Sequence, residues 1–132
     1  MKLENNWKYK SLFNLEKIYT KTLDEPPTRL VKRCLELIEV SLADYTIEDL
    51  RLMINQEFGL SYLIPLAIEK LQDNLFAEGD FYEGDLLAAV LSIDINFWQQ
   101  NPNLHKQIDF LIADSREKLV EMAISPKKFY GI

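Results

Sequence analysis

The stretch that decides the fold is GLSYLIPLAIEKLQD, residues 59–73. Its apolar residues recur at spacings of three and four, which is typical of a helix with one buried face: Leu63, Ile64, Ala67, Ile68 and Leu71. We expect Ser61 to cap this helix and Asp73-Asn74 to end it. Pro65 then falls in the first turn, where a missing backbone N–H costs least. Such a stretch predicts a core built from helices.

Outward from this stretch, the same apolar spacing predicts further helices, which begin at about Ser11, Thr28, Thr46, Tyr82, Asp94 and Asn103. Hydroxyl or carboxylate side chains at several of these starts are typical N-caps. We expect Gly59 to end the helix that begins at Thr46, and the last helix to run to about Ile124, before Pro126.

Glycine is scarce, with four residues in a chain of 132. A β-sandwich or β-barrel usually needs more turn glycines at regular spacing, and no segment shows a convincing strand pattern. The length suits one domain. We therefore expect an all-α protein, a single compact domain over residues 1–132 with about six to eight helices.

The composition excludes several classes of chemistry. The chain holds one cysteine, Cys34, and one histidine, His105, which leaves no disulfide framework and no Cys/His zinc site. We expect Cys34 to be a small core residue, His105 to be a surface or structural residue, and the protein to need no cofactor or metal. A net charge of −6 makes it a poor candidate for binding nucleic acid directly.

The sequence also gives an expectation of location. The first residues, MKLENNWKYKSL, lack the apolar run of a secretory signal. No stretch reaches the roughly 18 consecutive apolar residues of a transmembrane helix. We therefore expect a cytoplasmic protein with no membrane partner.

The negative charge is concentrated in one part of the chain. Residues 44–85 contain ten acidic and two basic residues, a net charge of −8, which exceeds that of the whole chain. Such a segment can attract a basic partner through its field. The simpler interpretation is a set of solvated helix faces that keeps the protein soluble.

The densest group of carboxylates is Glu78, Asp80, Glu83 and Asp85. Asp80 and Glu83 have the spacing of a capping box, and acids near a helix start are favoured by the helix dipole. The same carboxylates could instead contact a basic partner, or act in catalysis or bind a divalent ion. The spacing does not match a calcium-binding EF-hand loop. Tyr82 lies in this segment, and we expect its hydroxyl to stay in water.

Three segments, read together and in this order, resemble the immunity proteins of bacterial contact-dependent growth inhibition (CDI) systems. They are TIEDLRLMINQ (Thr46–Gln56), GLSYLIPLAIEKL (Gly59–Leu71) and AEGDFYEGDLLAAVL (Ala77–Leu91). The upstream SLFNLEKIY, PP and RLVKRC are also similar to the beginning of that family. The resemblance covers roughly residues 11–110.

The resemblance implies a small helical protein with no enzymatic activity. It would bind the C-terminal toxin domain of a large effector delivered by a neighbouring cell, as a monomer that forms a 1:1 complex. In similar systems many toxins are nucleases, including ribonucleases, and the immunity protein covers the active site or substrate groove. An acidic surface would complement the basic groove of a nuclease.

Charge and exposure, rather than the family, predict the toxin-contacting residues, namely Asp73, Glu78, Asp80, Tyr82, Glu83 and Asp85. Two other functions remain open from the sequence alone. One is a carboxylate-based or metal-dependent hydrolase that uses Asp80, Glu83 and Asp85, which would need these side chains to converge in a cleft. The other is a helical scaffold that packs against another subunit.

Overall fold

The computed structural model describes residues 3, 5–16 and 28–132. Within these residues the chain forms nine α-helices, two short 3-10 helices and no strand, which confirms the all-α class. The elements are η1 (Trp7–Tyr9), α1 (Leu12–Glu16), α2 (Arg29–Ile38), η2 (Leu42–Asp44), α3 (Ile47–Asn55), α4 (Leu60–Asp73), α5 (Asp85–Leu91), α6 (Ile95–Gln100), α7 (Pro102–Ile112), α8 (Arg116–Glu121) and α9 (Lys127–Tyr130).

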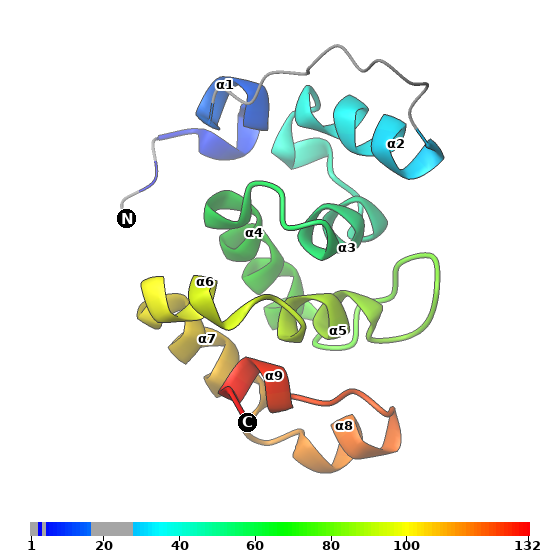
Figure 1. Cartoon of the computed structure of the whole chain (residues 1–132), viewed down its shortest axis with the longest axis vertical. Coiled ribbons are helices and arrows are strands. Elements are labelled where there is room, and N and C mark those ends of the chain that lie inside the picture. The colour runs from blue at the N-terminus through cyan, green and yellow to red at the C-terminus, as the bar shows by residue number, and fades with distance from the viewer. Residues whose placement is uncertain (1–2, 4, 17–27) are drawn as a thin grey trace.

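The helices follow one another along the long axis of the molecule (Figure 1). α1 and α2 form one end, α3, α4 and α5 lie in the middle, and α6 to α9 form the other end. α3 packs against both α4 and α5, α4 packs against α7, and α6 packs against α7 and α9. One core of buried side chains extends from Leu12 to Phe129.

Several helix starts are capped as the sequence predicts. The Thr28 hydroxyl accepts a 3.2 Å hydrogen bond from the Val31 N–H at the start of α2. Thr46 and Asp49 form a complete capping box at the start of α3, with hydrogen bonds of 3.1 and 3.0 Å. Asp94 caps α6 by accepting from the N–H of Asn96 at 2.8 Å. These contacts satisfy N–H groups that have no partner inside the helix.

The boundary between α3 and α4 differs from the prediction. Gly59 is the N-cap of α4 rather than the end of α3, and Ser61 lies inside the helix. Gly59 has a φ of +57°, and a Cβ there would lie 2.6 Å from Cδ2 of Leu12. The residue beyond the end of α3 with a left-handed backbone is instead Glu57, and the Phe58 N–H closes the helix onto the carbonyl of Met53.

Pro65 therefore lies deeper in α4 than predicted. Since the helix begins at Leu60, Pro65 falls in its second turn, inside the helix, and not in the first. Proline has no N–H, so the Ser61 carbonyl lacks the donor that normally lies four residues later.

The C-terminal region is the second difference. The sequence predicts one helix from about Asn103 to Ile124, but the chain breaks after Ile112 into α7 and α8. α8 ends at Glu121, with Ala123 in a left-handed conformation (φ +57°), and Pro126 is the N-cap of a further helix, α9. The stretch 113–118, with few apolar residues, was the signal for this break.

α5 also starts later than predicted, at Asp85 rather than at Tyr82. Its N-cap is Gly84, whose φ of +88° is costly for residues that carry a Cβ. Residues 74–84 therefore form a loop between α4 and α5, which we call the α4–α5 loop. This loop holds most of the residues that the sequence selects for partner binding.

Candidate functional site

The α4–α5 loop extends to one side of the molecule, close to α3 and α5 (Figure 1). Four predicted site residues lie exposed in it, namely Glu78, Asp80, Tyr82 and Glu83. Asp73 is exposed at the end of α4, just before the loop. Asp85 differs from the other five, because it is only 3% exposed at the start of α5. The structure therefore brings four of the six residues together on one exposed loop.

Asp85 holds the loop through its backbone. One carboxylate oxygen accepts a 2.6 Å hydrogen bond from the N–H of Gly79, and the other accepts from the N–H groups of Phe81 at 3.0 Å and Tyr82 at 3.3 Å. The predicted capping box between Asp80 and Glu83 is wrong, because α5 begins at Asp85 and its N-cap is Gly84, which has no side chain to cap the helix. The loop instead folds back onto Asp85, and the Asp80 N–H, which a capping box would use, donates to Glu48 on α3.

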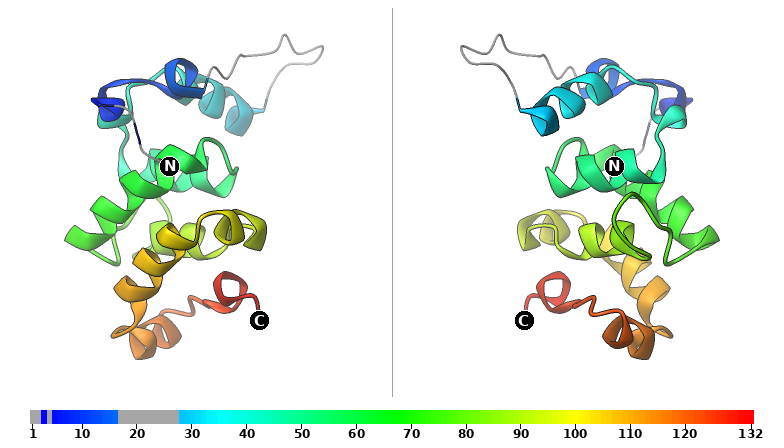
Figure 2. Two further views of the ribbon diagram at one scale, coloured as in Figure 1. Left: turned by 90° about the vertical axis from the view of Figure 1, so that its left-hand side faces the viewer. Right: turned by 90° about the vertical axis from the view of Figure 1, so that its right-hand side faces the viewer.

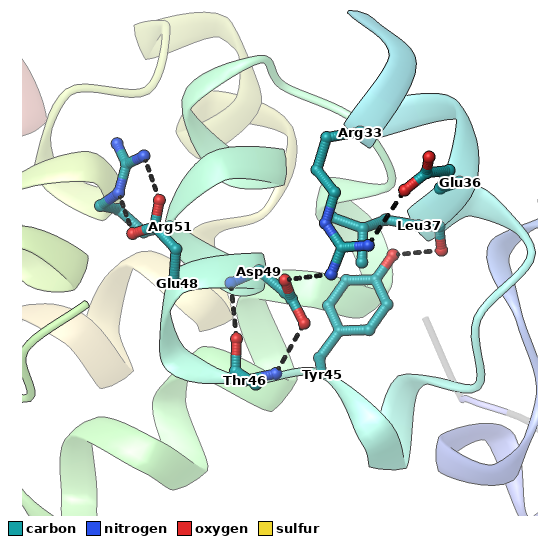
Figure 3. A network of polar contacts seen from close by, with 8 residues as sticks. All are labelled: Arg33, Glu36, Leu37, Tyr45, Thr46, Glu48, Asp49 and Arg51. Atoms are coloured by element: carbon teal, nitrogen blue, oxygen red, sulfur yellow. Dashed lines mark hydrogen bonds and ion pairs between the residues drawn. The ribbon is translucent and has the colours of Figure 1, made fainter. Parts of the chain in front are cut away.

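A second carboxylate, Glu48 on α3, holds the same loop from the other side. Its Oε1 accepts a 3.0 Å hydrogen bond from the N–H of Asp80. Arg51, one turn further along α3, donates two hydrogen bonds of 2.6 Å to Glu48 (Figure 3). This pair holds the pKa of Glu48 below its ordinary value, with Arg51 as the main cause and the Asp80 N–H adding to it. The Arg51 guanidinium also lies 4.3 Å from the ring centroid of Phe81.

Gly79 lies between these two carboxylates. A Cβ at this position would lie 2.6 Å from Oε1 of Glu48 and 3.1 Å from Oδ2 of Asp85. The backbone can approach both carboxylates this closely because glycine has no side chain. Sequence reasoning missed Glu48, Arg51 and Gly79 as parts of this site. The Glu48–Arg51 spacing signals a local ion pair, but nothing local indicates the contact with a loop 32 residues away.

The loop therefore uses most of its backbone N–H donors internally. The N–H groups of residues 79–82 bond to the two carboxylates, and those of Gly84 and Asp85 bond to loop carbonyls. Within the described chain, the carbonyls of residues 78–81 accept no hydrogen bond. Glu78, Asp80 and Glu83 are exposed, and they make no hydrogen bond or ion pair through their carboxylates with the described residues. The outer side of the loop thus offers acceptors of hydrogen bonds.

Elsewhere in the acidic segment, residues 44–85, some carboxylates are neutralised by contacts within the protein. Asp49, which is buried, accepts from Arg33 at 3.1 Å as well as from the Thr46 N–H (Figure 3). Glu69 pairs with Lys8. Together with Glu48 and Asp85, four of the ten acids serve internal contacts. The other six are exposed and, among the residues described, unpaired: Asp44, Glu57, Asp73, Glu78, Asp80 and Glu83. Half of these six lie on the α4–α5 loop.

Cys34 and His105 have structural positions, as predicted. Cys34 is buried in the core, and this burial raises the pKa of its thiol. The His105 ring stacks on Phe129 with 4.1 Å between ring centroids, and its Nε2 lies 3.1 Å from the Phe129 carbonyl oxygen. His105 thus connects α7 to α9. Trp98 is also buried, beside the same rings.

The geometry does not favour a carboxylate-based hydrolase at this loop. Asp85 is buried with both oxygens bonded to backbone N–H groups, whereas Asp80 and Glu83 are exposed. A shallow cavity of about 270 Å³ adjoins the loop, but its lining includes Asp85 and neither of the other two carboxylates. In the described part of the chain, no group of three His, Cys, Asp or Glu residues is arranged to hold a metal ion.

In the described part of the chain, no helix has both the length and the apolarity that a membrane span requires. In a comparison with known protein families, a model of CDI immunity proteins matches residues 14–108. The chain belongs to the CDI immunity protein family. Comparisons with curated proteins and with solved structures give no match.

The candidate site of this CDI immunity protein lies within the residues that the family model matches. Glu48, Gly79 and Asp85 all lie inside residues 14–108, as does the whole α4–α5 loop. α8 and α9 lie beyond the matched residues. The resemblance noted from three sequence segments is thereby confirmed.

Proposed function

We propose that this CDI immunity protein neutralises its cognate toxin domain through the α4–α5 loop, and that the toxin is a nuclease whose substrate groove the loop covers. The observation that carries this proposal is the direction of the hydrogen bonds in the loop. The N–H groups of residues 79–82 bond inward to Glu48 and Asp85, while carbonyls and three carboxylates remain for a partner. The complementary partner is a surface rich in donors that carry positive charge.

A nuclease groove has this chemistry. It must present lysine and arginine side chains to hold the phosphates of its substrate. A surface with exposed acidic residues competes for the same side chains, and opposite fields accelerate the encounter. Rapid capture suits the proposed setting, in which a toxin arrives in the cytoplasm and must be bound before it acts. Ribonucleases are one such class of toxin.

Two aromatic side chains add to the acidic surface. Phe81 is 69% exposed and Tyr82 is 51% exposed, so the loop offers apolar area as well as charge. Aromatic residues are frequent anchors of protein–protein interfaces because they bury a large area with few rotatable bonds. Phe81 is held in place by the Arg51 guanidinium against its ring. The proposed contact surface therefore consists of Asp73, Glu78, Asp80, Phe81, Tyr82 and Glu83.

Asp85 takes a different role in this proposal. Its burial keeps it from direct contact, and its bonds to three N–H groups fix the backbone that carries the contact residues. A loop that is already ordered loses less conformational entropy on binding than a mobile one. Asp85 and Glu48 are thus positioning residues for the contact surface.

The test is binding of the purified chain to the toxin domain of the effector encoded beside it. We expect a 1:1 complex, loss of nuclease activity, and association that slows as salt is added. The double substitution E78K/D80K should slow association on the order of tenfold. The matched control is D44K/E57K, which changes the net charge equally at exposed acids outside the loop.

Comparing the two variants distinguishes direct contact of the loop with the toxin from a general effect of net charge on the association rate. Slower association for E78K/D80K alone supports the proposal. Equal slowing of both variants overturns the loop as the contact surface, because net charge alone would then explain the effect. A toxin without nuclease activity overturns the proposed substrate class, and failure to form any complex overturns toxin binding.

A further inference from the structure

A groove runs along the face formed by α4 and α7. Two cavities of about 510 and 350 Å³ adjoin there, and both are lined by Gln72 of α4 and Gln107 of α7. The larger cavity reaches Trp7 near the N-terminus, and the smaller one ends at Phe110. The left view of Figure 2 is turned toward this side of the molecule, where α4 and α7 are both visible. Neither the fold nor the proposed toxin contact accounts for this groove.

The lining of the groove is polar but almost without net charge. Its side chains include a set of carboxamides, namely Gln72, Gln100, Asn101, Asn103 and Gln107. Among the hydrogen bonds of the described chain, only Asn101 of this set takes part, by donating to the Phe97 carbonyl at 2.9 Å. Of the charged residues in the lining, Glu69 is paired with Lys8, and Lys106 lies at the end near Phe110.

An exposed aromatic ring stands at one end of this groove. Phe110 of α7 is 82% exposed, and Leu111 beside it is half-buried. An apolar side chain of this size in water is favourable to cover, and the uncharged amides beside it can be desolvated at lower cost than carboxylates. The combination of an exposed ring and a hollow beside it is suited to insertion of a side chain from another surface.

We propose that two copies of this chain pair through this groove, with Phe110 of each copy packed in the groove of the other. A carboxamide carries both a donor and an acceptor, so a surface of carboxamides is complementary to itself. A two-fold axis places the same surface on both sides of an interface and therefore requires such self-complementarity. Carboxylates, in contrast, repel their own copies.

The charge of the molecule restricts where such pairing can occur. Each copy carries a net charge of −6, so two copies repel each other over most of their surfaces. The groove reduces this repulsion, because the only acid among the described residues that line it is Glu69, which is paired with Lys8. The α4–α5 loop projects on the other side of the molecule (Figure 1). Pairing therefore leaves the loop free. It departs from the monomer that the family resemblance implies, while the ratio of immunity protein to toxin stays 1:1.

The test is sedimentation velocity of the free chain over a concentration series from about 1 μM to about 1 mM. We expect a reversible monomer–dimer equilibrium, and F110D should raise the dissociation constant at least about tenfold. The matched control is V120D on α8, since Val120 is 80% exposed and lies outside the groove. Both residues are exposed, so both variants should retain the wild-type melting temperature.

A wild-type chain that stays monomeric throughout the series overturns the proposal. Equal weakening by F110D and V120D overturns the groove as the interface. If the wild type is monomeric and F110D no longer binds the toxin, the groove belongs to the toxin contact, which also overturns pairing. The loop variant E78K/D80K should still dimerise, so failure of this proposal and failure of the loop contact are distinguishable.

Discussion

Glu48 on α3 accepts a 3.0 Å hydrogen bond from the backbone N–H of Asp80, which lies 32 residues later in the α4–α5 loop. Asp85 holds the neighbouring N–H groups from α5. The loop is therefore fixed by two helices that pack on each other. Its conformation depends on charged side chains that are themselves shielded from a partner, and the following predictions separate those side chains from the exposed ones.

Replacing Glu48 by Gln should make stability less dependent on pH. Gln keeps an oxygen that can accept the Asp80 N–H, so E48Q removes the charge and costs about 1–2 kcal/mol at pH 7. Since the folded pKa of Glu48 lies below its ordinary value of 4.5, the unfolded chain binds the proton more readily. The advantage of the wild type is thus present above pH 4.5 and is lost as the pH falls through the folded pKa. Urea unfolding from pH 7 to pH 3 measures this, and a constant difference between the two proteins would contradict it.

Replacing Gly79 by Ala should destabilise the protein by about 1–3 kcal/mol, because the added Cβ would lie 2.6 Å from Glu48 Oε1. In an E48A background the same substitution should cost less, since the clashing atom is absent. A double-mutant cycle by urea unfolding measures this coupling. Additive effects of the two substitutions would show that the Glu48 contact does not limit the space at Gly79.

Replacing Asp85 by Ala should cost about 2–4 kcal/mol, since three N–H groups lose a buried acceptor. Hydrogen exchange of the amides of Gly79, Phe81 and Tyr82 should also accelerate. The control is E83A, which removes an exposed carboxylate from the same loop. It should change stability by less than about 0.5 kcal/mol. Unchanged protection of these amides in D85A would contradict the positioning role.

Substituting the two partners of the ion pair between α2 and α3 should lower the stability of the protein by different amounts. Asp49 is buried and both accepts from Arg33 and completes the capping box with Thr46. D49A should therefore cost about 1–2 kcal/mol. R33A removes a side chain that is 48% exposed and should cost less than about 1 kcal/mol. Thermal unfolding of the two variants provides the comparison, and a larger effect of R33A would contradict this ranking.

Local features of the fold could be predicted from the sequence. The caps at Thr28, Thr46 and Asp94 involve residues two or three positions apart, so their spacing is visible in the chain itself. Apolar spacing likewise indicates helices, because one turn repeats every 3.6 residues. The all-α class followed from these two signals.

Features that depend on distant contacts could not be predicted in this way. Gly59, the N-cap of α4, lies against Leu12 of a different helix, where a Cβ would not fit, and the sequence around Ser61 does not show this contact. The left-handed residues Glu57 and Ala123 end α3 and α8, although neither is the glycine that usually marks such a position. The cluster of acidic residues at the loop could be recognised in the sequence. That Asp85 is the buried one could not, because its burial depends on how α5 packs on α3.

The inward bonds of the α4–α5 loop have a consequence for how this protein can change. Because Glu48 and Asp85 bind the backbone and not the exposed side chains, substitutions at Glu78, Asp80, Tyr82 and Glu83 need not alter the path of the chain. Under the proposed toxin contact, these side chains can therefore change during evolution as the toxin changes, while the fold of the loop is retained. The same separation makes these positions a suitable library for redirecting the protein to a different target.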